Sequence, residues 1–371
     1  MTSPKTSRIS RKEFTPSAEF QERYHNLESI GDGGTGEVFK AMDTHLNRPV
    51  AIKWIKTKGV DDQVLADPWA EAKKLAAVSH PNIVSVYDRG QDQMRPYIVM
   101  ELIDGETVDD SIQRGVFNLQ EFEEFAVQTL EGLSAAHQAG IIHRDIKPAN
   151  LMLAPCPGRE FQVKILDFGL ARFLTTPKAQ TLNLDGTIAG SIYWISPEQV
   201  LQKPVDSRCD LYSVGSVCYY TLTGKQPFDC GSPFDALQAK LDHRIDNIRK
   251  LRPDLDRLLC QWIMGMMNPE PADRYQTAEE ALSVLKYVLH PPTVVAVPKA
   301  VPAPEPESSR EAQQSEPQAV ETQKPQEPAP KPAPARPVVQ PKLKAKAKLN
   351  PWVIAGIAIA VLVVLFLLIH R

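Results

Sequence analysis

The order of apolar and polar positions divides the chain into a part with short strands and a later part with long helices. The runs Val50–Ile55 and Ile98–Leu102 are short and apolar, which is typical of buried strands. Apolar residues at helical spacing follow over residues 121–138, 205–222 and 254–267. Because the strands come first and the helices later, the pattern predicts one α+β region with two lobes, over residues 24–290.

The segments on either side of this region lack such a pattern. Residues 1–23 are polar and mildly basic, and residues 291–350 are rich in Pro, Ala and Lys with few large apolar side chains. Segments of this kind bury too little apolar surface to offset the entropy of ordering them. We therefore expect a disordered leader at 1–23 and a disordered linker at 291–350.

Residues 351–371 contain the uninterrupted apolar run Trp352–Ile369. As a helix of 18 residues it would cover ~27 Å, close to the thickness of a hydrocarbon core. A buried core helix is the alternative, but an apolar helix behind a long linker has no surface on which to pack. The run predicts a single transmembrane helix with a two-residue tail, in contact with membrane lipid.

The charges beside this run predict its orientation. Four lysines precede the run, namely Lys342, Lys344, Lys346 and Lys348. After the run, only Arg371 carries a charge. Basic residues favour the cytoplasmic side, so we expect a single-pass membrane protein with its N-terminal domain in the cytoplasm. Gly356 and Ala360 are small residues four apart, which leaves a homodimer through the membrane open.

Composition narrows the function classes. The formal net charge of −3 gives no strong basic field, so we expect no nucleic-acid partner. The five cysteines form no C-x-x-C pair, and their odd number is unlike a secreted disulfide framework. The folded region therefore fits a reducing compartment.

A glycine-rich segment gives the first chemical signal. Gly31, Gly33 and Gly36 precede Val38 in a G-x-G-x-x-G-x-V pattern, which lets backbone amides approach phosphates. The same spacing occurs in dinucleotide-binding folds and in ordinary turns, so alone it is weak. Since residues 37–40 continue as a strand and do not open a helix, the pattern favours a phosphate-binding hairpin.

Lys53 lies inside the apolar run Val50–Ile55. A buried ammonium needs an anion, because leaving it unpaired costs free energy. Glu71, on the amphipathic stretch Trp69–Val78, is the candidate within the protein, and nucleotide phosphates are the candidate outside it. A purely structural ion pair is the alternative, and both partners can bind together.

The segment His143–Asn150 carries the strongest signal, because charged and polar residues crowd directly behind apolar ones. Asp145 can orient a hydroxyl or accept its proton, and Lys147 can neutralise a phosphoryl group in transfer. Asn150 and Asp167, which lies 17 residues further on behind an apolar strand, offer oxygen ligands for Mg²⁺.

Together these segments resemble the eukaryotic-like, or Hanks-type, serine/threonine protein kinases, in their bacterial branch. The resemblance covers residues 24–290 and includes V-A-I-K at Lys53, H-R-D at Asp145, D-F-G at Asp167, and Ser196-Pro197-Glu198 where the family has A-P-E. It implies a bilobal kinase fold that uses ATP with Mg²⁺ or Mn²⁺. The implied reaction transfers the γ-phosphate to Ser or Thr hydroxyls of proteins.

The resemblance also implies roles for single residues. Asp145, Lys147, Lys53 and Glu71 would be catalytic, with Asn150 and Asp167 as metal ligands. The implied ATP-binding residues are Ile30, Gly31, Gly33, Gly36, Val38, Ala51, Lys53, Glu101, Ile103 and Met152, with Met100 at the gatekeeper position. A structural role is implied for Asp210 and for the pair of Glu198 with Arg274.

Regulation is a further expectation. Arg144, beside the catalytic aspartate, can pair with a phosphate on the loop between Gly169 and Ser196. We expect autophosphorylation there, at Thr187 or Thr181. A pseudokinase, or a membrane-tethered scaffold that binds partners through its kinase-like domain and proline-rich tail, is the alternative. Against it, the lysine, aspartate and D-F-G positions carry no substitution.

Overall fold

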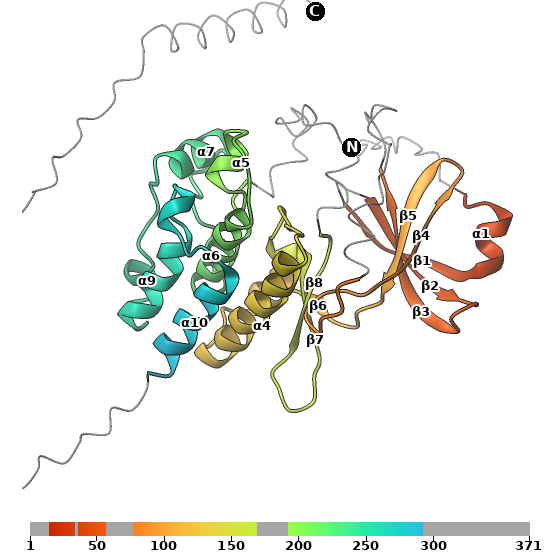
Figure 1. The fold of residues 1–371 in the computed structure, drawn as a ribbon, viewed down its shortest axis with the longest axis horizontal. Helices are drawn as coiled ribbons and strands as arrows, with labels where there is room; N and C mark the ends of the chain where they lie inside the picture. The colour runs from red at the N-terminus through yellow and green to blue at the C-terminus, as the bar shows by residue number, and fades with distance from the viewer. Residues whose placement is uncertain (1–14, 34–35, 57–76, 169–191, 292–371) are drawn as a thin grey trace, which may run out of the picture. The chain divides into compact units, whose positions relative to one another are not determined.

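The computed structural model describes residues 15–33, 36–56, 77–168 and 192–291. A lobe built on a β-sheet comes first along the chain, and a mainly helical lobe follows (Figure 1). The α+β, two-lobed arrangement that the sequence predicts is therefore confirmed.

The first lobe holds a five-stranded antiparallel sheet in the order β1-β2-β3-β5-β4. Its strands are β1 (Tyr24–Asp32), β2 (Gly36–Asp43), β3 (Arg48–Ile55), β4 (Val86–Asp92) and β5 (Arg95–Glu101). The predicted apolar runs form β3 and β5, which pair directly with each other and occupy the centre of the sheet.

Strand β3 is buried on both faces from residue 50 to residue 55. Successive side chains of a strand point to opposite faces, so alternate residues join different clusters. Val50, Ile52 and Trp54 pack into the apolar core of the sheet lobe. Ala51 packs with Val84 and Met100 instead, in a separate cluster. The reason for the continuous apolar run is that both faces of the strand are covered.

The prediction that residues 1–23 are disordered is wrong for the last part of this segment. Residues 18–23 form helix α1 (Ala18–Arg23), whose N-terminus is capped by the Ser17 side chain. Phe20 on this helix is 5% exposed and lies 4.7 Å, centroid to centroid, from the rings of both Tyr24 and Trp54. One large aromatic side chain thus supplies the buried surface that the rest of this polar segment lacks.

The second lobe contains a three-stranded sheet, in the order β6-β7-β8, and a group of helices. The strands are β6 (Glu106–Thr107), β7 (Leu151–Ala154) and β8 (Gln162–Ile165). The helices are α3 (Val108–Arg114), α4 (Leu119–Gln138), α5 (Pro197–Val200), α6 (Arg208–Thr223), α7 (Pro233–Leu241), α8 (Ile248–Leu251), α9 (Arg257–Met266) and α10 (Ala278–Leu289), with short 3-10 turns η2 (Pro148–Asn150) and η4 (Pro271–Asp273).

Helices α4, α6, α9 and α10 pack on one another around the core of this lobe (Figure 1). The predicted helices match α4, α6 and α9, with shifts of a few residues at their ends. Helix α6 begins at Arg208 and stops before Gly224, whose φ of 67° is the left-handed conformation that ends helices. Helix α9 begins at Arg257 because the Asp256 side chain caps it.

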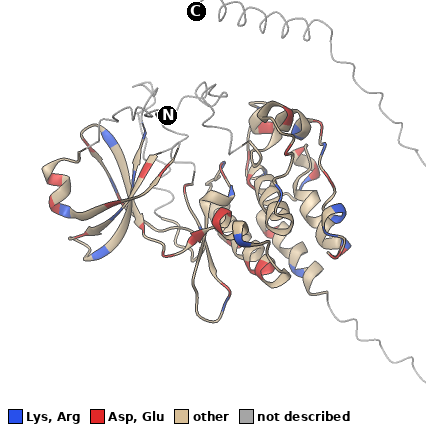
Figure 2. Cartoon of the chain, turned by 180° about the vertical axis from the view of Figure 1, so that it is seen from behind, with Lys and Arg blue, Asp and Glu red and all other residues tan. Residues whose placement is uncertain are grey.

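Acidic and basic positions are interspersed along the ribbon of both lobes, as Figure 2 shows. None of the helices in the described ranges combines the length and the apolar character needed to cross a membrane. The predicted linker at 291–350, apart from its first residue, and the predicted span at 351–371 lie outside the described residues.

Candidate active site

The glycine-rich segment forms the hairpin between β1 and β2, as predicted. The amide N–H of Gly33 donates to the carbonyl of Gly36 over 2.9 Å. A Cβ added at Gly36 would lie 2.2 Å from the carbonyl oxygen of Trp54, so the close approach of β2 to β3 requires glycine there. At Gly31 and Gly33 an added Cβ would make only ordinary van der Waals contacts, the nearest at 3.9 Å.

Sequence reasoning missed the group that supports this hairpin. The Lys56 ammonium donates to the Asp32 carboxylate over 2.5 Å and to the Gly33 carbonyl over 2.7 Å. These contacts tie the turn to the end of β3. Ile30, an expected ATP contact, lies on β1 and is 49% exposed.

Lys53 projects from β3 towards the second lobe and is almost completely buried. Its ammonium lies 2.5 Å from the carboxylate of Asp167, the aspartate of the D-F-G motif. Burial alone raises the pKa of Asp167, but the Lys53 ammonium outweighs it and holds the pKa below its ordinary value. The structure thus joins one predicted catalytic residue to one predicted metal ligand. Glu71, the other expected partner of Lys53, lies outside the described residues.

Asp145, Lys147 and Asn150 lie together on the loop that precedes β7. The Lys147 ammonium is 2.8 Å from the Asp145 carboxylate. The Asn150 side-chain amide donates to the Asp145 carbonyl over 2.8 Å and to its carboxylate over 3.1 Å. Lys147 and the Asn150 amide both donate to the same carboxylate oxygen, Oδ2, so neither of these hydrogen bonds uses Oδ1 of Asp145.

A buried carboxylate from α6 fixes the backbone of this loop. Asp210 is fully buried and accepts hydrogen bonds from the amides of His143, over 2.8 Å, and Arg144, over 2.7 Å. Arg144 adopts a φ of 65°, which is unfavourable for a residue with a side chain. Two N–H groups that point to one carboxylate offset this cost. The expected structural role of Asp210 is seen in this geometry.

Asp210 also contacts a residue that sequence reasoning did not single out. Its carboxylate lies 2.8 Å from Nε2 of His137 at the end of α4. Burial by itself raises the pKa of Asp210, while His137 and the loop amides lower it, and the net pKa lies below its ordinary value. No pattern in the sequence marks His137, since its partner is 73 residues away.

His143 contacts both the loop that carries Asp145 and the segment that precedes Asp167. Its Nδ1 accepts from the amide of Asp145 over 3.2 Å, so Nε2 carries the hydrogen and donates to the carbonyl of Leu166 over 2.6 Å. Burial lowers the pKa of His143, in keeping with a neutral ring. The ring also packs on Phe168 at 4.6 Å between centroids. His143 thereby holds the backbone at Asp145 and at Leu166, the residue before Asp167.

The predicted metal ligands come from adjacent segments. The amide of Leu166 donates to the carbonyl of Asn150 over 2.9 Å, which holds Asn150 beside the residue that precedes Asp167. The NH₂ group of the Asn150 side chain donates to Asp145, so the side-chain oxygen of Asn150 is available as a metal ligand. One amide oxygen and one carboxylate suit Mg²⁺ that is also bound by phosphates. Within the described residues, no group of three His, Cys, Asp or Glu side chains could hold a metal ion by itself.

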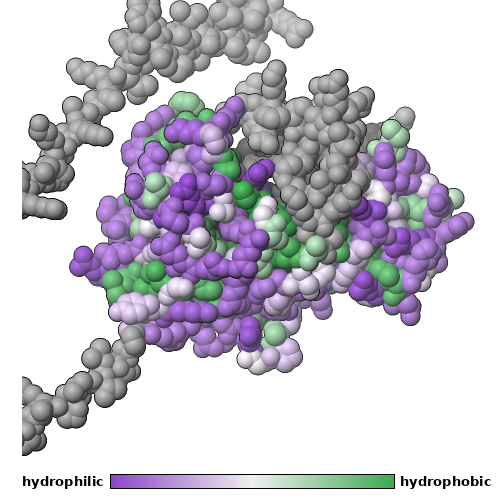
Figure 3. All heavy atoms as spheres, viewed as in Figure 1, coloured by the Kyte–Doolittle hydropathy of each residue, from purple (hydrophilic) through white to green (hydrophobic). Residues whose placement is uncertain are grey.

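An apolar cluster lies between the lobes. Ala51, Val84 and Met100 are buried together, and the partly buried residues around them are Val38, Leu102, Ile103 and Leu166. Figure 3 shows hydrophobic surface near the centre of the face that it presents and a further hydrophobic area at lower left, among mostly hydrophilic residues. The cluster offers apolar faces for a flat aromatic ring. Met152, on β7, is partly buried and is not a member of this described cluster.

Glu101 ends β5 where the chain passes between the lobes. Its amide donates to the carbonyl of Ser85 over 2.9 Å. Its side chain pairs with the Lys164 ammonium over 2.8 Å, across to strand β8. Lys164 was absent from the sequence-based candidates, because nothing in the sequence places β8 behind this connection.

Arg274 and Glu198 form the expected pair, and its geometry is bidentate. The guanidinium donates to the two carboxylate oxygens over 2.7 and 2.8 Å. The side chains are 0% and 6% exposed, for arginine and glutamate respectively. Arg274 uses its remaining N–H groups on the carbonyls of Asn268, Arg208 and Pro269. All five donors are therefore satisfied.

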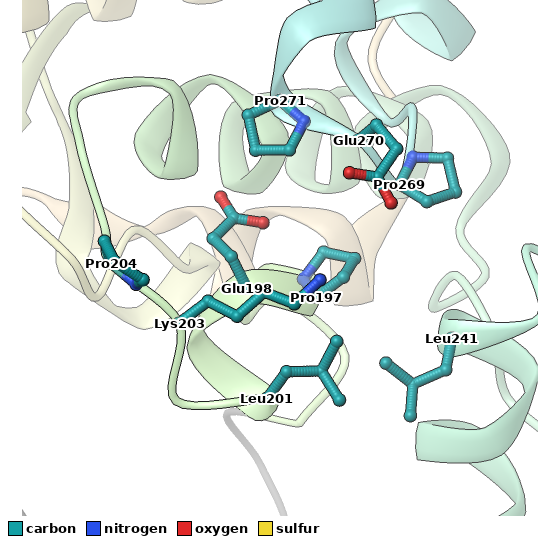
Figure 4. Close-up of a pocket in the computed structure, with 9 residues that line it drawn as sticks. All are labelled: Pro197, Glu198, Leu201, Lys203, Pro204, Leu241, Pro269, Glu270 and Pro271. Carbon is teal, nitrogen blue, oxygen red and sulfur yellow. The ribbon is translucent and has the colours of Figure 1, made fainter. Parts of the chain in front are cut away.

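A pocket of about 220 Å³ lies beside this pair (Figure 4). Residues from α5, the loop after it, α7, the segment before η4 and the start of η4 line it, namely Pro197, Glu198, Leu201, Lys203, Pro204, Leu241, Pro269, Glu270 and Pro271. None of these residues belongs to the glycine-rich hairpin or to the His143–Asn150 loop. The expected phosphorylation sites Thr181 and Thr187 lie outside the described residues.

Comparisons of this chain with known proteins agree on one family. The protein kinase domain family matches residues 24–290. PknL of Mycobacterium tuberculosis, a serine/threonine-protein kinase, is 34% identical over 71% of this chain and 64% of its own length. A "Probable serine/threonine-protein kinase" of Clostridium acetobutylicum is 36% identical over 72% of this chain and 40% of its own length.

A third relative, from Corynebacterium glutamicum, is named "Probable serine/threonine-protein kinase PknB" and is 36% identical over 70% of this chain and 41% of its own length. The chain thus spans about two fifths of the length of two of these relatives. The crystal structure of the PknI kinase domain of Mycobacterium tuberculosis, at 23% identity, matches with a TM-score of 0.56 over 71% of this chain and 95% of that domain. That likeness supports the fold. By its family match, the chain belongs to the protein kinase family, and the relatives named here are bacterial proteins named as serine/threonine-protein kinases.

Proposed function

We propose that this chain is an ATP-dependent serine/threonine protein kinase whose kinase domain is held at the cytoplasmic face of a membrane. One observation carries the catalytic part of the proposal. Asp145 meets Lys147 and Asn150 on one loop, and the Asn150 carbonyl is hydrogen-bonded to the residue before Asp167, which pairs with Lys53. This is the set of groups that phosphoryl transfer requires.

In this proposal, the substrate hydroxyl donates to the carboxylate oxygen of Asp145 that its neighbours do not use. Asp145 orients the hydroxyl towards the γ-phosphate and receives its proton as the new P–O bond forms and the bond to the β-phosphate oxygen breaks. The Lys147 ammonium, 2.8 Å from Asp145, stabilises the negative charge on the transferred group. Asn150 and Asp167 would hold Mg²⁺ or Mn²⁺, which supplies positive charge to the phosphates.

ATP would be bound by groups of both lobes. Gly31 and Gly33 carry no side chain that would keep phosphate oxygens away from the backbone amides, and Lys53 can pair with the α- and β-phosphates. The adenine ring would pack between Val38 and Ala51 on one side and Met152 on the other. Backbone groups of Glu101 and Ile103 would hydrogen-bond its edge.

The substitution Asp145→Asn tests the catalytic assignment, because it keeps the shape of the side chain and removes the base. We expect kcat for phosphate transfer to a Ser/Thr peptide to fall by roughly 10²–10⁴-fold, the range for a general base. Transfer is measured with labelled ATP, and thermal melting establishes that the variant is folded. A folded Asp145→Asn chain with transfer close to wild type would show that the assignment is wrong.

Membrane attachment is proposed from the apolar run Trp352–Ile369 and the lysines before it. Two central charges, Val361→Arg and Leu362→Arg, should abolish insertion, since each arginine at the centre of a span costs ~2.5–3.5 kcal/mol. Fractionation of cells with alkaline extraction should find the wild-type chain in the membrane pellet and the double variant in the supernatant. Equal distribution of both would refute the anchor.

Autophosphorylation at Thr187 or Thr181 is proposed from their place in the loop between the D-F-G and S-P-E segments. Mass spectrometry of the recombinant chain should find phosphate at one of these threonines, and none on Asp145→Asn. An active wild-type enzyme without phosphate in this loop would contradict the proposal.

A further inference from the structure

Asp32 is an acidic residue inside the hairpin that the proposed function places on the phosphates of ATP. It lies between Gly31 and Gly33, at the end of β1. Because Asp32 is bonded directly to both glycines, its carboxylate lies within roughly 8 Å of their backbone amides. That distance is about one Debye length at physiological salt, so ions in the solvent screen the charge only in part. An Asp32 without a counter-charge would therefore repel the phosphates.

Lys56 supplies this counter-charge. Its ammonium lies 2.5 Å from the Asp32 carboxylate, and both side chains are 37% exposed. The same ammonium donates to the carbonyl of Gly33 over 2.7 Å. A carbonyl oxygen carries partial negative charge, so it would oppose phosphate oxygens if it faced them. One lysine thus engages two acceptors of the hairpin, one charged and one neutral.

The register of the sheet brings this pair together from separate strands. Strand β2 lies between β1 and β3. Gly36, the first residue of β2, is opposite Ile55, the last residue of β3, so Lys56 follows where β2 begins. Neighbouring strands are about 4.8 Å apart, so the side chains of Asp32 and Lys56 bridge about 10 Å between their backbones. The pair therefore links β1 to the end of β3 at the turn of the hairpin.

Two lysines near the end of β3 have different partners. Lys53 pairs with Asp167 of the D-F-G motif over 2.5 Å. Lys56, three positions later, binds the hairpin instead. Glycines have no side chains that could fix this turn by packing, and they lose more conformational freedom on ordering than other residues do. A contact from outside the turn can supply the order that its glycines do not.

We propose that Lys56 is a positioning residue for nucleotide binding: it neutralises Asp32 and holds the Gly33 carbonyl, so that the hairpin meets the phosphates of ATP with its amides. The inference rests on the proposed kinase activity. Lys56 acts through these two groups of the hairpin and does not itself bind the nucleotide. Its loss should weaken the binding of the phosphates and leave the binding of adenosine and of the protein substrate unchanged.

The experiment uses the full chain, steady-state kinetics with ATP and a generic Ser/Thr protein substrate, and inhibition by adenosine, a probe without phosphates. Lys56→Met removes the charge at similar length, and Lys56→Arg keeps it. We expect the KM for ATP to rise about fivefold in Lys56→Met, the upper end of the range for an exposed ion pair, and to stay near wild type in Lys56→Arg. The inhibition constant of adenosine and the KM for the protein substrate should not change.

Asp32→Asn decides whether Lys56 acts through Asp32. This variant removes the carboxylate, so its KM for ATP should not exceed that of wild type. When Lys56→Met is combined with Asp32→Asn, no charge is left to neutralise, and the KM for ATP should return to within about twofold of wild type. A double variant as weak as Lys56→Met alone overturns the inference, because Lys56 would then bind the phosphates itself. The ratio of KM for ATP between Lys56→Met and wild type should also fall towards one at about 1 M salt, and a ratio that does not fall contradicts the role of charge.

Lys250→Met on α8 is the matched control, because Lys250 is an exposed lysine whose ion pair with Asp246 spans 3.1 Å. Its kinetics should equal wild type, and thermal melting establishes that each variant is folded. An unchanged KM for ATP in a folded Lys56→Met chain refutes the inference, as does an equal loss of affinity for adenosine. Should Lys56→Met fail to fold, Lys56→Gln takes its place with the same expectations. A wild-type chain that transfers no phosphate contradicts the proposed function itself, a result distinct from an active enzyme whose Lys56 variants keep their KM for ATP.

Discussion

The buried pair of Glu198 and Arg274 allows a quantitative prediction about stability. Glu198→Gln preserves the shape of the side chain and removes its charge, which leaves the Arg274 guanidinium buried at 0% exposure without a counter-charge. Breaking a buried ion pair in this way costs about 3–5 kcal/mol. For a domain of this size, each kcal/mol lowers Tm by roughly 2–4 °C, so we expect a fall of roughly 6–20 °C.

Thermal unfolding of the full chain, followed by tryptophan fluorescence, measures this difference. The control is Asp246→Asn, which breaks an exposed ion pair with Lys250 over 3.1 Å on α8. Exposed pairs contribute little to stability, so the control should melt close to wild type. If Glu198→Gln melts within the range of the control, the pair is not the structural tie that its five satisfied guanidinium donors indicate.

Three further predictions follow from single contacts. Gly36→Ala should lower Tm and raise the KM for ATP because a Cβ there would lie 2.2 Å from a backbone carbonyl oxygen, whereas Gly33→Ala, whose Cβ would make an ordinary contact at 3.9 Å, should melt like wild type; equal Tm values for the two variants would refute this steric argument. Phe20→Ala should cost about 3–5 kcal/mol, seen as a lower Tm, and an unchanged Tm would mean that α1 does not support the sheet lobe. His137→Gln should move acid unfolding to higher pH. The lowered pKa of Asp210 stabilises the fold above the ordinary aspartate range, and this stability is lost as pH falls through the folded pKa, which rises when His137 is removed. An acid midpoint that stays in place or moves to lower pH would contradict that coupling.

The sequence predicted which candidate residues lie together where the pattern that marks them is local. Asp145, Lys147 and Asn150 lie within six positions of one another, so a single loop brings them together whatever surrounds it. The apolar run around Lys53 likewise indicated a strand covered on both faces. Element boundaries were less accurate, because caps such as Asp256 and Gly224 decide them one residue at a time.

Tertiary structure decided the contacts that hold this chemistry in place. Asp210 and Arg144 are 66 residues apart, and Lys53 and Asp167 are 114 apart, so no local pattern joins them. The sequence also did not predict that α1 is ordered. Burial of Phe20 can stabilise this polar segment only because the folded sheet provides the apolar surface on which Phe20 packs.

By itself, then, the sequence determined which groups are available for catalysis and the order of strands and helices, because periodicity and short motifs act over a few residues. Only the folded lobes decided how the catalytic loop is fixed and which ion pairs are buried. The physical reason is that a buried polar group must find its partner wherever packing brings one near.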